Sequence, residues 1–320
     1  MESDIAVELD YVSSYRRLLQ FRRFEEIVGD GVRSGAIHGE MHLAIGHEAI
    51  AVGIEPLVRR GDAIISTHRP HLHALVAGVD PCVLLAELYE RDGGLSGGKG
   101  GHMHLFDPDH DFMCTGIVGA SAPLALGYAY ERMLRESDEI AICIIGDGAA
   151  NHGTFAESLN MAALYDIPVL FIVEDNGYAI SVARSSSSAG EIHRRGESHG
   201  IPGWRCDGRR VQEVRSVAQE AFAHVRNGRG PAILVAECER FRGHYEGDID
   251  HYRSSAEKDS FPDRDPILLA EKAMSEAGMS KEEMDSIEKQ VTAEISGWLE
   301  DALRNPFPDP LQALNGVFTA

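Results

Sequence analysis

The sequence has few basic residues. Its 320 residues contain 30 Lys and Arg against 51 Asp and Glu, a formal net charge of −21 with histidine neutral. A nucleic-acid-binding surface or a contact with an anionic membrane needs a basic face, so this balance argues against both. No apolar run approaches the roughly 20 residues that a bilayer span requires. We therefore expect neither a nucleic-acid nor a membrane partner.

Cysteine is also scarce. The five cysteines are scattered, odd in number and form no CxxC pair. Reduced thiols in a cytoplasmic protein are the simplest interpretation. Residues 1–10 are acidic and lack the apolar core of a signal peptide, which favours the same cytoplasmic location. The hydrophobic content of 43% and charged content of 25% are ordinary for a globular protein.

Three continuous apolar runs, at 140–145, 168–173 and 232–236, are typical of strands buried on both faces. Helical patterns at 153–165 and 212–226 separate them. This alternation predicts an α/β fold with a parallel sheet and helices on both faces.

We expect one domain over residues 1–320, with an N-terminal helix at 10–30 and a C-terminal helical extension at 266–304. The long polar segment 240–265 has no periodicity, and we interpret it as a mobile loop. The remaining predicted elements are helices at 47–59, 81–92 and 117–136, a strand at 63–65, a histidine-rich turn at 68–73 and a glycine-rich loop at 93–101.

Polar residues follow two of the buried strands, at the sheet edge where ligands bind in parallel folds. Asp147 comes after the first strand, and Asn176 after the second, 29 residues later. This spacing is close to one strand–helix–strand unit, so the two side chains can converge if the strands are neighbours. Carboxylate and amide oxygens suit Mg²⁺. Gly148, Ala149 and the following helix offer backbone N–H groups to a diphosphate.

These residues belong to a wider pattern. The stretch from Gly146 through Asn176 to Ser181 resembles the thiamine diphosphate motif. Roughly residues 15–275 are similar to the alpha subunit of the decarboxylating first component of 2-oxo acid dehydrogenase complexes and of acetoin dehydrogenase. The other matching segments, in order, are 46–49, 68–71, 97–101 with Met103 and His104, 116–118 and 240–245.

The resemblance implies a thiamine diphosphate-dependent oxidoreductase. It would cleave acetoin or a small 2-oxo acid, pyruvate or branched-chain, and transfer the acyl group to lipoamide. The segment 243–248 is more similar to the acetoin type than to the pyruvate type.

The resemblance also implies roles for individual residues. Asp147, the Asn176 side chain and the Tyr178 carbonyl would bind Mg²⁺. His244 and His71 match two active-site histidines. The cofactor contacts would come from His68, Arg69, Gly116, Val118, Gly148, Ala149 and His244, with Gly116 and Val118 at the aminopyrimidine. His68 stands where the family usually has tyrosine.

The resemblance further implies partners. In the family, the glutamate that activates the cofactor lies on a separate beta subunit, and this sequence offers no candidate for it. We therefore expect an alpha2-beta2 heterotetramer that passes its acyl group to a lipoyl-bearing acyltransferase.

Other functions stay open. One is a split transketolase-like enzyme acting on a sugar phosphate. Another is a zinc hydrolase, since imidazole is a good zinc ligand, although the sequence contains no HExxH pattern. A silent scaffold subunit is the third. The histidines that suggest zinc are His68, His71, His73, His102 and His104.

Overall fold

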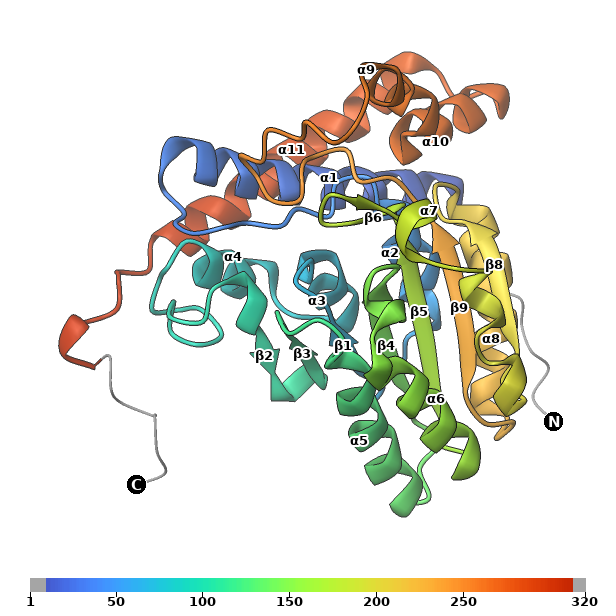
Figure 1. Ribbon diagram of the computed structural model, residues 1–320. Coiled ribbons are helices and arrows are strands. Elements are labelled where there is room, and N and C mark those ends of the chain that lie inside the picture. The colour runs from blue at the N-terminus through green and yellow to red at the C-terminus, as the bar shows by residue number, and fades with distance from the viewer. Residues whose placement is uncertain (1–9, 313–320) are drawn as a thin grey trace.

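The computed structural model describes residues 10–312. Its centre is a seven-stranded sheet in the order β2-β3-β1-β4-β5-β9-β8 (Figure 1). Every neighbouring pair is parallel except β2 and β3. The strands are β1 (Ala63–Ser66), β2 (Phe106–Asp107), β3 (Phe112–Cys114), β4 (Ala141–Gly146), β5 (Val169–Asp175), β8 (Gly203–Asp207) and β9 (Ala232–Glu237). The predicted α/β class is confirmed.

The sheet is buried on both faces because alternate residues of each strand enter different cores. Along β4, Ile142 and Ile144 join one core, whereas Cys143 and Ile145 join the other. The first core is covered by α2 (Glu48–Ile54), α8 (Val211–Arg226) and the helices of both chain ends. The second is covered by α5 (Ser121–Leu134) and α6 (Gly153–Leu164).

The helices of the two chain ends pack together along one side of the molecule, at the top of Figure 1. Helix α1 (Tyr11–Ser34) starts at the Asp10 side chain, which accepts two backbone N–H groups, and ends at Gly35 in the left-handed conformation. It packs on α10 (Pro266–Glu276) and α11 (Lys281–Leu303). Helix α11 begins with a capping box between Ser280 and Glu283.

Several predicted boundaries need correction. The histidine-rich segment 68–73 is not only a turn, because α3 (His71–Ala77) begins inside it. Strands β2, β3 and β8 were not predicted. The segment 240–265 is irregular up to residue 254 but then forms α9 (Ser255–Asp259) and a short 3₁₀ turn, Phe261–Arg264. The predicted helix at 81–92 is α4 (Pro81–Leu88), which ends before the glycine-rich loop.

Two further elements lie next to the predicted site. Strands β6 (Tyr178–Ala179) and β7 (Val182–Ala183) form a small hairpin, followed by the single turn α7 (Arg184–Ser187). All five cysteines are free. Within residues 10–312, no helix combines the length and the apolar character needed to cross a membrane.

Candidate active site

One cavity of about 410 Å³ opens beyond the carboxyl ends of β1, β4 and β5. Ten of the eleven residues that the sequence predicted for the site line it. They are His68, Arg69, Gly116, Val118, Asp147, Gly148, Ala149, Asn176, Tyr178 and His244. A second cavity of similar volume lies between α1, α8 and α10 and contains none of them. The sheet edge therefore gathers residues that are up to 176 positions apart.

Asp147 and Asn176 approach one another because β4 and β5 are adjacent and in register, with Gly146 opposite Glu174. Asp147 is 1% exposed, and its Oδ2 atom has no hydrogen-bond partner among residues 10–312. Burial and the neighbouring Asp175 raise the pKa of the Asp147 carboxyl to about 6. A buried carboxylate oxygen without a partner is costly, and a bound cation would remove that cost. The Asp147 environment thus fits a Mg²⁺ ion.

Two guanidinium groups, those of Arg69 and Arg240, face the same cavity. Both side chains are buried, and neither forms an ion pair with a carboxylate in the described part of the chain. Burial, together with the charge of Arg240, lowers the pKa of Arg69 to about 9. Burial also lowers the pKa of Arg240. Two buried cations without anionic partners fit an anionic ligand such as a diphosphate.

Neutral partners hold the two arginines in place. Arg69 donates to the carbonyl oxygens of Leu43 and His244, both at 2.7 Å. Arg240 donates to the Ile180 carbonyl oxygen at 2.8 Å and to the Tyr252 hydroxyl at 2.6 Å. The Nε atom of Arg240 has no partner. These contacts position the guanidinium groups and leave their charge uncompensated.

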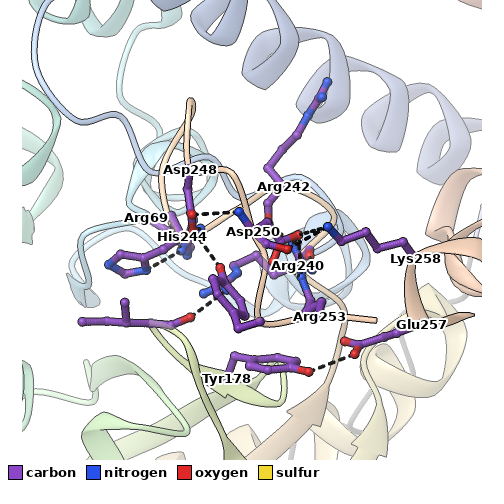
Figure 2. A network of polar contacts seen from close by, with 12 residues as sticks. Arg69, Tyr178, Arg240, Arg242, His244, Asp248, Asp250, Arg253, Glu257 and Lys258 are labelled. Atoms are coloured by element: carbon purple, nitrogen blue, oxygen red, sulfur yellow. Dashed lines mark hydrogen bonds and ion pairs between the residues drawn. The ribbon is translucent and has the colours of Figure 1, made fainter. Parts of the chain in front are cut away.

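The segment that carries His244 is held by its own network (Figure 2). Asp248 accepts a hydrogen bond from the His244 backbone N–H at 2.6 Å and another from the Tyr252 hydroxyl at 2.8 Å. Asp250 forms ion pairs with Arg253 and with Lys258. Through Tyr252, which also binds Arg240, this network fixes both the histidine and the arginine at the cavity.

Tight backbone packing shapes the opposite wall. A Cβ atom on Gly148 would lie only 2.6 Å from the Cβ of Ala179, so no larger residue fits there. A Cβ on Gly116 would lie 3.2 Å from the Sδ atom of Met103, which also lines the cavity. Val118 is 59% exposed at the cavity rim. At Gly148 and Gly116 the cavity is therefore lined by main chain without a side chain.

His71 is the predicted site residue that does not reach the cavity. Its side chain is fully buried, and Nδ1 lies 3.1 Å from both carboxylate oxygens of Glu25 in α1. Its ring is 5.8 Å from that of His102, which in turn contacts His42 at 2.9 Å. His71 thus faces Glu25 of α1 and does not line the cavity.

The histidines that suggested zinc do not gather at one point. His73 contacts Ser66 and Glu174, and the Nδ1 atom of His104 contacts the Gly100 carbonyl. Only His68 joins a group with metal-ligand spacing in the described residues, and its companions are His42 and His244.

The sequence analysis missed two residues of this region, Arg240 and His42. Arg240 lies in the 240–245 motif but was not singled out, because the sequence does not show that its charge is buried without a partner. His42 carries no motif of its own, and only the fold brings its ring within 4.7 Å of His68 and of His244.

The comparisons with known proteins agree with this geometry. A family model described as "Dehydrogenase E1 component" matches residues 16–311. The chain belongs to this E1 dehydrogenase family.

Three similar proteins illustrate the match. The alpha subunit of an acetoin:2,6-dichlorophenolindophenol oxidoreductase from Cupriavidus necator is 40% identical over 96% of this chain and 93% of its own length. The pyruvate dehydrogenase E1 component subunit alpha of Rhizobium meliloti is 41% identical over 94% of this chain and 87% of its own. Its counterpart in Rickettsia felis is 37% identical over 97% and 96%.

E1 dehydrogenases use thiamine diphosphate, and this chain is accordingly an oxidoreductase of that class. The family match favours the dehydrogenase over the split transketolase-like enzyme and the zinc hydrolase. It also agrees with the cavity, whose cationic end and unpaired carboxylate suit a diphosphate bound with a metal ion.

Proposed function

We propose that this chain is the alpha subunit of a thiamine diphosphate- and Mg²⁺-dependent dehydrogenase that cleaves acetoin or a small 2-oxo acid. The observation that carries the proposal is the charge arrangement of the cavity. Two buried guanidinium groups without carboxylate partners, Arg69 and Arg240, line the same cavity as Asp147, whose Oδ2 has no partner. A metal-bound diphosphate would supply negative charge to the two guanidinium groups and a cation to the Asp147 carboxylate.

In this proposal Asp147, the Asn176 side chain and the Tyr178 carbonyl oxygen hold the Mg²⁺. Arg69, Arg240, His68, His244 and the backbone N–H groups at 148–149 bind the diphosphate. The bound cofactor supplies a nucleophilic carbon and an electron sink for cleavage of the substrate C–C bond.

His244 is the residue of this chain best placed to handle a proton. Burial and the charges of Arg69 and Arg240 lower its pKa to about 4, so its ring is neutral at pH 7. A neutral imidazole can accept a proton at one nitrogen and hold a hydrogen bond with the other. We propose that His244 receives or donates the proton that accompanies acyl transfer to lipoamide. His71 does not line the cavity and forms its hydrogen bonds to Glu25, so we assign it no proton-transfer role in this proposal.

A second polypeptide completes the site in this proposal. Asp147 is the one carboxylate among the described residues that line the cavity, and it is committed to the metal. Activation of the cofactor needs another carboxylate, so we propose that a beta subunit supplies it in an alpha2-beta2 assembly. The relatives named above are themselves called alpha subunits.

Apolar side chains on α5 and α6 support such a partner. These two helices pack against one another and expose several large hydrophobic residues. They are Leu124, Tyr130 and Leu134 on α5, and Met161 and Leu164 on α6, followed by Tyr165. We propose that subunit contacts cover this surface, and that a lipoyl-bearing acyltransferase is the acceptor of the acyl group.

Native mass spectrometry of the protein purified from its own host, with Mg²⁺ and thiamine diphosphate present, tests the assembly. We expect a tetramer with a second polypeptide and about two cofactors. A homo-oligomer without cofactor would overturn the proposal.

The substrate is tested on the same preparation. Acetoin, pyruvate and a branched-chain 2-oxo acid are compared with dichlorophenolindophenol as the electron acceptor, and with a lipoylated protein domain as the acyl acceptor. Activity with ketose phosphates but none with these substrates would instead support the transketolase-like enzyme.

A further inference from the structure

Three histidines from separate parts of the chain meet beside the cavity. His42 precedes α2, His68 lies between β1 and α3, and His244 lies in the segment after β9. Their ring centroids are 4.7 Å apart for His42 with either partner and 5.4 Å apart for His68 with His244. One ring nitrogen from each lies within 4.8 Å of the others. Zinc–nitrogen bonds place the nitrogens of one tetrahedral site about 3.4 Å apart, so a rotation of these rings brings them into ligand positions.

The orientation of His42 adds to this arrangement. Its Nδ1 atom contacts Nε2 of His102 at 2.9 Å, which leaves Nε2 of His42 for another partner. Both rings are buried. Metal-binding histidines usually hold their second nitrogen in such a hydrogen bond, because it fixes the ring and its tautomer.

We propose that His42, His68 and His244 bind one divalent transition metal ion, with Zn²⁺ the best match, when thiamine diphosphate is absent. Neutral imidazole suits zinc. His68 and His244 line the cavity, so the fourth coordination position is open to it. Arg69 donates a hydrogen bond to Nδ1 of His244 at 3.3 Å, so a metal ion bound at that nitrogen displaces the guanidinium from it. An anionic fourth ligand, chloride or phosphate, would offset the repulsion between Arg69 and the metal ion.

A metal held here would compete with thiamine diphosphate. This part of the inference rests on the proposed function, in which His68 and His244 bind the diphosphate. The three-histidine site would then act as a zinc-sensitive block on cofactor loading. The metal site depends on His68, because a tyrosine at this position, which is usual in the family, would leave only two imidazoles.

Cobalt substitution tests the site directly. Cofactor is removed from the purified full-length protein together with any copurifying subunit, and Co²⁺ is titrated in a chloride buffer. We expect one equivalent to bind with the visible absorption of a four-coordinate cobalt ion, and Zn²⁺ to displace it. His68→Tyr should weaken binding at least tenfold.

His104→Ala is the matched control, because His104 lies at an exposed position and, among the described residues, its side chain hydrogen-bonds the Gly100 carbonyl alone. This variant should bind cobalt as the unmodified protein does. His42→Asn provides a second variant of the site, and circular dichroism checks that each variant is folded. Equal binding by the unmodified protein and by both His68→Tyr and His42→Asn, no binding at all, or a sulfur-to-cobalt charge-transfer band would each overturn the proposal.

Competition is measured separately. Magnesium thiamine diphosphate should release the cobalt from the unmodified protein, whereas magnesium ADP, which carries the same diphosphate group, controls for chelation in solution. Cobalt binding that depends on His68 but resists thiamine diphosphate would keep the metal site and contradict the proposed cofactor position.

Discussion

Asp147 shows what the candidate site demands from a single residue. Its carboxylate is buried, has one oxygen without a partner and carries a raised pKa. A group whose folded-state pKa lies above its unfolded value supports folding below the unfolded pKa and loses that support as the pH rises through the folded one. Without a metal, ionised Asp147 therefore destabilises the chain above about pH 6.

The isosteric variant Asp147→Asn tests this balance. The shift from 3.8 to about 6 corresponds to roughly 3 kcal/mol, which is an upper bound on the gain in unfolding free energy. In EDTA at pH 8 we expect the variant to be more stable in urea by up to that amount, and the difference to shrink toward pH 4. With Mg²⁺ and thiamine diphosphate, only the unmodified protein should gain stability. A variant that is less stable in EDTA would contradict the unpaired carboxylate.

Arg240 is a buried cation of the same cavity, without a carboxylate partner among the described residues, as Asp147 is its buried anion. Arg240→Leu should weaken thiamine diphosphate binding by about 10- to 150-fold, since a charge-assisted hydrogen bond contributes roughly 1.5–3 kcal/mol. Isothermal titration calorimetry in Mg²⁺ buffer measures the affinity of each variant for thiamine diphosphate. Arg135→Leu is the control, because the Arg135 side chain is 74% exposed and, within the described residues, forms one ion pair, with Glu131 of α5. Similar affinities for the two variants would exclude Arg240 from the diphosphate site.

Among the elements, the glycine-rich loop depends on one helix residue. Glu87 of α4 is buried, and its carboxylate accepts the backbone N–H groups of Ser96, Gly98, Gly100 and Gly101 at 2.7–3.2 Å. Gly98 has a φ of +70°, a conformation that other residues adopt at a cost. The loop leads directly to His102 and to Met103, which lines the cavity. A single carboxylate thus organises the approach to the site.

Glu87→Gln should loosen this loop. An amide keeps one acceptor oxygen but turns an NH₂ group toward backbone donors, so we expect a loss of about 1–3 kcal/mol. Hydrogen exchange followed by mass spectrometry should show faster exchange at 96–101, with β4 and β5 unaffected. The control is Glu276→Gln at an exposed position of α10. Unchanged exchange in the loop would show that the carboxylate does not hold it.

The elements also show how far sequence reasoning reaches. Strands β4, β5 and β9 were predicted because continuous apolar runs have few alternatives in a soluble chain. Strand β8 was missed because it lies at the sheet edge, where Trp204 and Arg205 can stay partly exposed and break the apolar pattern. Helix α3 was missed because its first turn carries His71 and His73, which are buried through Glu25 and Glu174, partners distant in sequence.

The same reasoning applies to the site. Residues that bind through motifs at strand ends, such as Asp147 and Asn176, are visible in the sequence because the topology fixes where they meet. The contact between His42 and His244 is not visible in the sequence, because it depends on how the segment 240–254 folds over the sheet edge.

At the scale of the whole molecule, ion pairs join distant segments of the chain. Arg22 of α1 contacts Glu48 of α2 at 2.5 Å and Asp265, the residue that caps α10, at 3.0 Å. Arg16 contacts Glu294 of α11 at 2.5 Å. The Arg22 cluster is largely buried, so removing one of its members costs more than removing a member of an exposed pair.

Arg22→Met should therefore destabilise the chain by about 3–5 kcal/mol, because it leaves the fully buried carboxylate of Glu48 without its cation. Arg23→Met, one residue along, should cost less than about 1 kcal/mol, since Arg23 and Glu26 are half-exposed partners on the same helix. Urea unfolding of both variants gives the comparison. Equal losses would show that the buried cluster is not a stabilising link.

The packing of α1 on α10 and α11 joins the first helix of the chain to helices that are synthesised much later. Residues 16 and 294 are contact partners separated by 278 positions. At a synthesis rate of about 5–20 residues per second, the ribosome needs roughly 15–55 s to produce the second partner after the first. Throughout that interval Tyr15, Arg16 and Gln20 of α1 lack their hydrogen-bond partners Glu271 of α10 and Glu294 of α11. The packing of α1 on α11 is therefore among the last contacts of the fold to form during synthesis.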